Sequence, residues 1–174
     1  LLALAALELP PGAEVITPAV TWATTVFPIS QVGAVPVLVD VDRATYNISP
    51  EAMWDAITPK TRAIMPVHYA GMPCDMDKIS KIARKYKLAI IEDAAHALGA
   101  EYQKSKIGSC RYSDMTVFSF HAVKQITSGE GGIVLTNDQG LYERLMAFRS
   151  HGITRDHSLF VNPNEEDWYY EMQS

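Results

Sequence analysis

Short apolar runs alternate with helix-like segments along most of the chain, and this order constrains the fold more than any other feature of the sequence. The predicted strands are EVITP (14–18), VPVLVDVD (35–42), RAIMPVHY (62–69), LAII (88–91), MTVFSF (115–120) and GGIVLTN (131–137). The predicted helices are TWATTVFPISQVG (21–33), SPEAMWDAI (49–57), DMDKISKIARKYK (75–87) and DQGLYERLMAFRS (138–150). Strand and helix units in this order predict an α/β fold with a mostly parallel sheet between helices.

Local signals support these elements. Ser49 followed by Pro50 is typical of a helix start. The helix predicted over 75–87 has an apolar face formed by Met76, Ile79, Ile82, Ala83 and Tyr86. The run LAII is apolar throughout, as expected of a strand that is covered on both faces. The segment YQKSKIGS (102–109) indicates a hairpin. We find no signal for an internal domain boundary.

Composition excludes several classes of protein. A formal charge of −5 over 174 residues, with mixed signs, argues against a nucleic-acid partner. Cys74 and Cys110 lie far apart and form neither a disulfide framework nor a metal motif, which fits the cytoplasm and predicts no metal. No apolar run is long enough for a membrane-spanning helix. The opening LLALAALELPPG reads as a helix already under way, and EEDWYYEMQS (165–174) ends without a cap, so we expect a fragment truncated at both ends.

Two oppositely charged residues follow neighbouring buried strands. Asp93 ends the run LAIIED, and Lys124 comes shortly after MTVFSF. Ligands of parallel α/β sheets bind beyond the carboxyl ends of the strands, so both residues are candidates for a site. They could form a structural ion pair, or they could hold a third molecule between them. His68 and Tyr69, at another strand end, either touch a substrate or pack there.

Pyridoxal 5'-phosphate (PLP) is a molecule that needs both groups. Its aldehyde forms a Schiff base with a lysine amine, and a buried aspartate keeps its ring nitrogen protonated. Its phosphate needs hydroxyl and N–H donors, which Ser119 could supply. Trp22, just after the first strand, is a candidate to stack on the ring. SGEGG lacks the spacing of a dinucleotide-binding loop, and its glycines favour a tight turn instead.

Four segments together give a specific resemblance. In chain order, VITPAVTWATT, PVHYAG, EDAAHALGAEY and VFSFHAVKQITSGEGG resemble the DegT/StrS family of PLP-dependent nucleotide-sugar aminotransferases, in which the motifs fall in the same order. The resemblance implies the large domain of the aspartate-aminotransferase type, PLP fold type I, with a mixed, mostly parallel, seven-stranded sheet in three layers. It also implies that residues 1–174 are part of the PLP-binding large domain, without the upstream phosphate loop and the small C-terminal domain.

The resemblance assigns roles to five residues. Lys124 matches the Schiff-base lysine that also moves the proton. Asp93 matches the partner of the ring nitrogen, and Trp22 the aromatic residue of the family's T-(W/F)-x-x-T segment. His96 stands where many members have glutamine near the ring oxygen, and Ser119 matches the phosphate-binding serine. Because the family's sugar dehydratases carry histidine in place of the lysine, Lys124 favours transamination.

The implied function is amino transfer, with glutamate as donor, to a keto group of a nucleotide-linked deoxy sugar. The segments TPAVTW and PVHYAGMPCDMD favour a UDP-linked 4-keto sugar of lipid A or another cell-surface polysaccharide. The implied assembly is a homodimer, because the family builds each site from two subunits. The alternatives are a PLP-dependent sugar dehydratase and a non-catalytic sensor or scaffold.

Overall fold

The computed structural model describes residues 1–162 and 168–172; the remaining residues, which include parts of the predicted uncapped segment 165–174, lie outside the described part. The helices are α1 (Leu2–Ala5), α2 (Ala23–Gln31), α3 (Pro50–Asp55), α4 (Met76–Tyr86) and α5 (Gln139–Arg149). The strands are β1 (Glu14–Pro18), β2 (Val35–Val39), β3 (Thr61–Ile64), β4 (Ala89–Asp93), β5 (Glu101–Tyr102), β6 (Ser105–Lys106), β7 (Met115–Ser119), β8 (Gly132–Leu135), β9 (Ile153–Thr154) and β10 (Glu171–Met172). Two 3₁₀ turns, η1 (Tyr69–Gly71) and η2 (His157–Leu159), complete the described elements.

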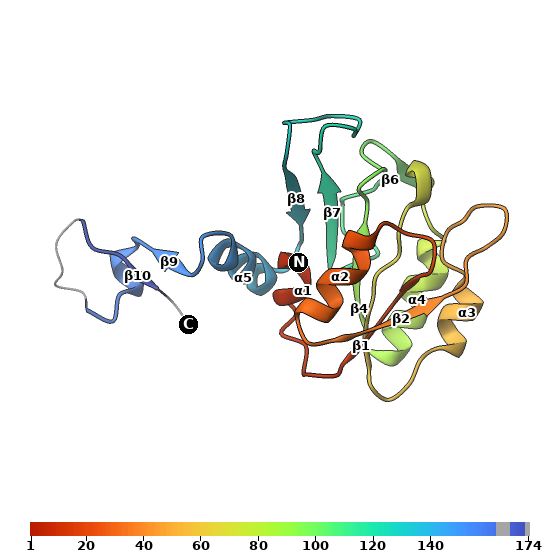
Figure 1. Ribbon diagram of the computed structural model, residues 1–174, viewed down its shortest axis with the longest axis horizontal. Helices are drawn as coiled ribbons and strands as arrows, with labels where there is room; N and C mark the ends of the chain where they lie inside the picture. The colour runs from red at the N-terminus through yellow and green to blue at the C-terminus, as the bar shows by residue number, and fades with distance from the viewer. Residues whose placement is uncertain (163–167, 173–174) are drawn as a thin grey trace.

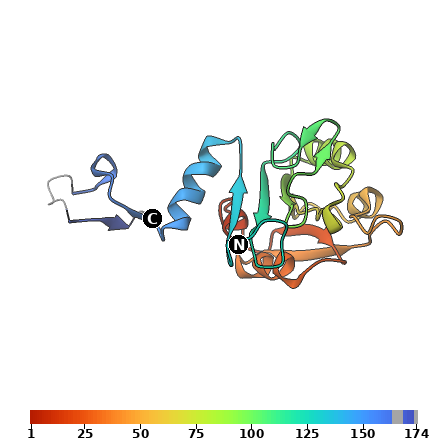
Figure 2. The ribbon, with the colours of Figure 1, turned by 90° about the horizontal axis from the view of Figure 1, so that it is seen from above.

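The central sheet is mixed and mostly parallel. It has six strands among the described residues, in the order β2-β1-β3-β4-β7-β8. Neighbours from β2 to β7 pair in parallel, and only β8 runs antiparallel to its neighbour β7. Helices lie on both faces, and the carboxyl ends of the parallel strands meet at one edge (Figures 1 and 2). The predicted three-layer α/β class is therefore confirmed.

Each face of the sheet has its own core, because side chains alternate along a strand. On one face, Val15, Ala63, Ile91 and Met115 pack with side chains of α1, α2 and α5. On the other face, side chains of the neighbouring positions pack against α3 and α4: these include Ile16, Ile64, Ile90, Met53, Met76 and Ile79. A strand residue's position in this alternation thus decides which layer it faces.

The strand predicted over 62–69 is shorter in the structure. β3 ends at Ile64, and pairing with β4 resumes only at an isolated bridge between Val67 and Asp93. Pro66 lies in the gap and has no N–H for the sheet, although its carbonyl still accepts from the N–H of Asp93 at 2.9 Å. Beyond Ile64, single hydrogen bonds therefore hold this segment against β4 in place of a continuous strand ladder.

The helix α4 follows its predicted pattern except at the last position. Met76, Ile79, Ile82 and Ala83 are buried, as predicted. Tyr86 was expected on the same face, but its side chain is 38% exposed. It lies at the end of the helix, where its ring packs edge-on against Trp54 of α3 at 5.7 Å between centroids. Tyr86 is the last residue of the helix, because the backbone of Lys87 turns into the left-handed region. Its side chain therefore lies at the margin of the apolar face and stays exposed.

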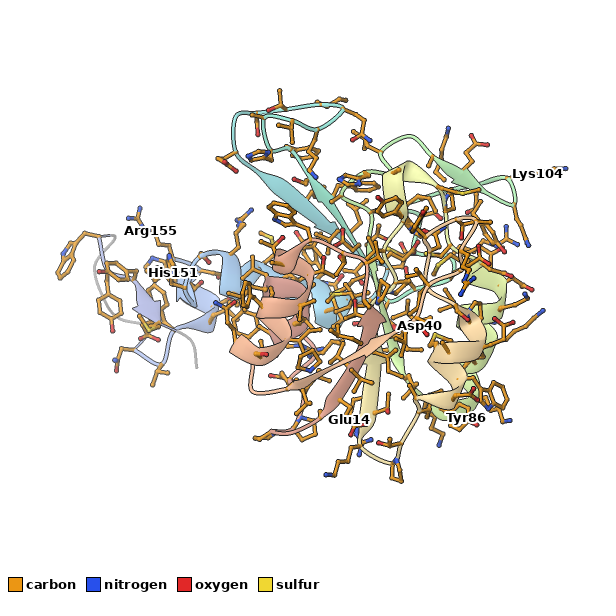
Figure 3. The ribbon with its side chains drawn as sticks, turned by 45° about the vertical axis from the view of Figure 1, so that its right-hand side comes forward. Glu14, Asp40, Tyr86, Lys104, His151 and Arg155 are labelled. Carbon is orange, nitrogen blue, oxygen red and sulfur yellow. The ribbon has the colours of Figure 1, made fainter. Side chains whose placement is uncertain are left out.

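Two small two-stranded sheets lie outside the main one. β5 and β6 form the hairpin predicted over 102–109, with positive φ at Gln103 and Lys104 in its turn. The sequence analysis did not predict β9 and β10, which pair beyond α5 and project away from the main sheet, in the part of the molecule that carries His151 and Arg155 (Figures 1 and 3). None of the described helices has the length and hydropathy to cross a membrane.

The start of α3 offers a test of local stability. The Ser49 hydroxyl accepts a hydrogen bond from the N–H of Ala52 at 3.1 Å. We expect Ser49→Ala to lower the free energy of unfolding by about 1 kcal/mol, because that N–H loses its partner. Ser30→Ala, at an exposed position of α2, should change it by less than about 0.5 kcal/mol. Urea unfolding compares the two, and equal effects would contradict the cap.

Candidate active site

Asp93 lies at the carboxyl end of β4, on the same face of the sheet as α2. One carboxylate oxygen accepts a hydrogen bond from the Thr25 hydroxyl at 2.8 Å, and the other accepts from the N–H of Ala95 at 3.1 Å. Thr21 in turn donates to Thr25 at 2.8 Å. Asp93 is only partly buried. Its carboxylate is thus held in place by neutral donors and remains accessible.

Ser119 lies beyond Asp93 on the neighbouring strand. Because Asp93 pairs with Val117 of β7, Ser119 stands about 7 Å further along the same face. Its oxygen accepts a hydrogen bond from the N–H of His121 at 3.3 Å, which shapes the turn out of the strand. That bond uses a lone pair of the oxygen. The hydroxyl proton donates to no other described residue.

Lys124 lies in the loop between β7 and β8, which rises above the carboxyl edge of the sheet (Figure 1). Its N–H donates to the carbonyl of His121 at 2.9 Å, so the loop begins as a tight turn. The SGEGG segment completes the return, with positive φ at Gly129 and Gly131. The predicted turn-forming role of these glycines is confirmed. Lys124 itself is half-buried.

A hydrogen bond ties the lysine loop to the segment after β4. The side-chain amide of Gln125 donates to the carbonyl of His96. The same carbonyl abuts Gly71 of η1: a Cβ added there would lie 2.7 Å from it, at a φ of +86°. The segments that carry Asp93, His96 and Lys124 are therefore adjacent. The His96 side chain is exposed, and only its backbone takes part in this contact.

Trp22 stands at the start of α2, close in sequence to the residue that binds Asp93. Its carbonyl accepts from the N–H of Thr25 at 2.9 Å, and its side chain is 77% exposed. An exposed indole at the carboxyl edge is available to cover a flat ligand. Among the described residues, the fold brings the segments of all five predicted site residues to one edge of the sheet.

The charges at this edge decide between the two arrangements left open by the sequence. Within the described residues, no salt bridge joins Asp93 to Lys124, and neither takes part in any other. The hydrogen bonds to the Asp93 carboxylate come from neutral donors, and the amino group of Leu1 also interacts with it electrostatically. A carboxylate of this kind fits the protonated nitrogen of a pyridine ring, and the lysine amine fits the aldehyde.

Two contact residues were missed by the sequence analysis. Thr25 is the last threonine of the TWATT segment, so a signal was present but unused. Gln125, next to the lysine, had no signal of its own. His68, for which two roles were open, is 0% exposed and packs inside the protein.

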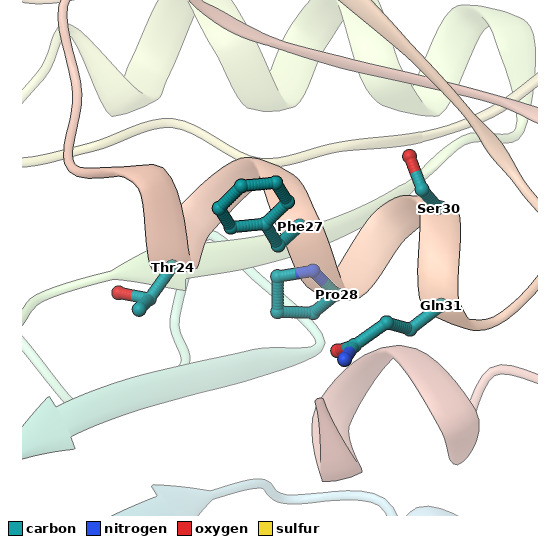
Figure 4. Close-up of a pocket in the computed structure, with 5 residues that line it drawn as sticks. All are labelled: Thr24, Phe27, Pro28, Ser30 and Gln31. Atoms are coloured by element: carbon teal, nitrogen blue, oxygen red, sulfur yellow. The ribbon is translucent and has the colours of Figure 1, made fainter.

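Two buried cysteines and a surface hollow lie away from this edge. Cys74 and Cys110 are free and buried, and burial raises the pKa of Cys74 to about 12. The described residues contain no cluster of metal-ligating side chains. A hollow of about 460 Å³ lies on the outer surface of α2, lined by residues such as Phe27 and Gln31 (Figure 4). The described residues that line it include no titratable group.

Thr25 provides a test of this geometry. We expect Thr25→Val to weaken PLP binding by the full-length protein about tenfold, because the carboxylate of Asp93 loses a charge-assisted hydrogen bond. Thr25→Ser should restore binding, and Thr24→Val, on the exposed side of the same helix, should leave it unchanged. Titration of each variant with PLP gives the dissociation constants. Equal affinities for Thr25→Val and the wild type would contradict the contact.

The fold and this edge define a class. A mostly parallel sheet whose carboxyl edge carries a lysine loop beside a partly buried aspartate is the arrangement of PLP enzymes of fold type I. The sequence model of the DegT/DnrJ/EryC1/StrS aminotransferase family matches residues 1–163, and the chain belongs to this family. The family depends on PLP. The predicted membership and cofactor are confirmed at this level.

Similar proteins support the assignment. The uncharacterized protein MJ1066 of Methanocaldococcus jannaschii is 52% identical over 171 residues, which cover 98% of this chain and 44% of that protein. The crystal structure of 3-amino-5-hydroxybenzoic acid synthase is 43% identical with a TM-score of 0.84, over 89% of this chain and 40% of that one. Spr1654 of Streptococcus pneumoniae, assigned as a sugar aminotransferase and solved in a PLP form, is 33% identical with a TM-score of 0.85, over 99% and 47% of the two chains. This chain spans less than half the length of each.

Proposed function

We propose that this chain is the PLP-binding part of an aminotransferase that converts a keto group of a nucleotide-linked sugar to an amine. The observation that carries the proposal is the carboxylate of Asp93, hydrogen-bonded by neutral donors, beside the loop of Lys124 at the edge where parallel sheets bind ligands. Residues 1–174 then belong to the large domain. The phosphate loop and the small domain belong to other parts of the full-length protein.

PLP supplies, when bound, a protonated ring that accepts the electron pair left on a substrate carbon when its proton leaves. The amine of Lys124 would hold the aldehyde carbon of the cofactor and would carry the proton to and from the substrate carbon. The carboxylate of Asp93 keeps the proton on the ring nitrogen, since the ion pair favours the charged form. Thr25 and the N–H of Ala95 hold that carboxylate in place.

Three further residues bind the cofactor in this proposal. The hydroxyl of Ser119 donates to the phosphate, because its proton is not used within the described protein. The indole of Trp22 covers the face of the ring. The side chain of His96, exposed beside the lysine loop, approaches the ring oxygen. These roles follow from the family resemblance and from the positions of the residues at one edge.

The substrate we favour is a UDP-linked 4-keto deoxy sugar, with glutamate as amino donor, in the synthesis of lipid A or another cell-surface polysaccharide. The segments TPAVTW and PVHYAGMPCDMD support it by resemblance, and the similarity to Spr1654 supports a sugar substrate. The full-length protein would act as a homodimer in the cytoplasm. Lys124 favours amino transfer over dehydration, because the sugar dehydratases of the family carry histidine at this position.

The test uses the full-length protein with PLP, glutamate and a panel of UDP-, TDP- and GDP-linked keto sugars, with mass spectrometry of the products. We expect an amino sugar from the UDP-linked 4-keto compound. An amino sugar from another nucleotide would correct the substrate but keep the reaction. Loss of water without amination would identify a dehydratase, and no product with bound PLP would favour a non-catalytic protein.

A further inference from the structure

A buried polar network lies directly beneath Asp93, on the opposite face of the sheet. Glu92 precedes Asp93 on β4 and therefore points the other way, where it is only 3% exposed. One of its carboxylate oxygens lies 2.7 Å from Nε2 of His68. The other accepts hydrogen bonds from the hydroxyls of Ser113 and Thr116, the latter at 3.2 Å. The charge is thus surrounded by donors from three parts of the chain.

The contacts of His68 fix its protonation. Its Nδ1 accepts a hydrogen bond from the N–H of Cys74 at 3.1 Å, so this nitrogen carries no proton. The proton of the neutral ring is then on Nε2, which donates to Glu92. The Cys74 thiol does not compete, because it donates to the carbonyl of Val67 at 3.1 Å. The side chain of Glu92 thus accepts hydrogen bonds from three neutral donors.

The same segments hold the peptide groups of Asp93. The N–H of His68 donates to the carbonyl of Asp93 at 3.0 Å, and the N–H of Asp93 donates to the carbonyl of Pro66 at 2.9 Å. On the other side, the N–H of Ala94 donates to the carbonyl of Val117 at 2.9 Å. Regular pairing of β3 with β4 has already ended here. Side-chain contacts of Glu92 therefore join the end of β4 to the segment after β3, where the ladder has stopped, and to the first part of β7.

We propose that Glu92 is a positioning residue for the candidate site: with His68 and Thr116 it fixes the end of β4, so that the carboxylate of Asp93 meets the ring nitrogen of PLP. This proposal rests on the proposed function, since it assumes that PLP binds at Asp93. The physical need is clear, because a charged partner acts on a ring proton only when it is held within about 0.5 Å of the productive geometry. Neither Glu92 nor His68 touches the cofactor.

The experiment compares Glu92→Gln and Thr116→Val with Thr61→Val in the full-length protein. An amide keeps the shape of Glu92 but cannot accept from all three donors. Thr61 is an equally buried threonine at the amino end of β3, where its hydroxyl donates to Glu14 at 3.3 Å. Glu14 lies at the edge opposite the lysine loop (Figure 3). The control therefore loses a buried hydroxyl at the far end of the sheet.

We expect Glu92→Gln to weaken PLP binding about tenfold and to lower kcat about a hundredfold with little change in the KM of the amino donor. Thr116→Val should act in the same direction and less strongly. With ¹⁵N-labelled PLP, the ring-nitrogen resonance should move toward the unprotonated value in Glu92→Gln and, by a smaller amount, in Thr116→Val. Thr61→Val should lower the free energy of unfolding by an amount similar to that of Thr116→Val. It should leave PLP binding, kcat and the ring-nitrogen resonance unchanged.

Three results separate the possible failures. If the wild type binds PLP and Glu92→Gln shows the same ring-nitrogen resonance, affinity and kcat, the positioning role is wrong and the proposed function stands. An effect of equal size in Thr61→Val would likewise assign the network a purely structural role. If the wild type itself binds no PLP, the proposed function is wrong, and the positioning role with it.

Discussion

Lys124→Ala should abolish amino transfer by the full-length protein, with a fall in kcat/KM of about 10⁴-fold or more. Alanine has no amine to hold the cofactor aldehyde or to carry the proton, and no other lysine stands in the loop between β7 and β8. The absorbance band of the bound cofactor near the visible edge should disappear. Borohydride reduction of the wild type followed by peptide mass spectrometry should find the cofactor attached at Lys124.

The control for this prediction is Lys60→Ala. Lys60 is exposed in the turn before β3, at the amino end of the sheet. Its removal should leave the absorbance band and the rate unchanged. Persistence of the band in Lys124→Ala, or cofactor attached at another lysine after reduction, would remove the assignment.

Asp93→Asn should lower kcat by about 10²- to 10³-fold while the cofactor still binds to Lys124. The amide is isosteric: its oxygen can accept from the N–H of Ala95 while its NH2 group donates to the Thr25 hydroxyl, so the site keeps its shape. It carries no charge, however, and the pyridinium form of the ring loses its ion pair. Single-turnover kinetics with glutamate would measure the loss at the proton-transfer step.

Asp114→Asn is the matched variant. Asp114 also accepts a backbone hydrogen bond, from Ile90 at 2.7 Å, but at the start of β7 and away from the lysine loop. We expect it to retain near wild-type kcat. If Asp93→Asn were as active as Asp114→Asn, the ring nitrogen would need another partner.

Most of the fold could be predicted from the sequence, because its signals are local. The run EVITP became β1 over the same residues, and Ser49 with Pro50 marked the start of α3. The largest error was the strand over 62–69. Its apolar residues fit a strand, but Pro66 interrupts the ladder, and the sequence pattern did not show where pairing would stop.

The site was predicted in part, because a motif names residues but not their partners. Asp93 and Lys124 were selected by their positions after strands, while their relation was left open between an ion pair and a shared ligand. In the described structure they do not pair, since Thr25 occupies the carboxylate and the loop of Lys124 attaches through Gln125. The cofactor roles of the five residues remain predictions.

The sequence by itself determined which segments form strands and helices, which family the chain resembles and which residues are candidates for its chemistry. Only the tertiary structure decided that Thr25 meets Asp93 across 68 positions, that Glu92 and Asp93 serve opposite faces, and that His68 is a buried donor. The physical reason is the sequence separation over which each kind of signal acts. Periodicity and capping act within a few residues, whereas these contacts depend on the order of the strands in the sheet and on where their pairing ends.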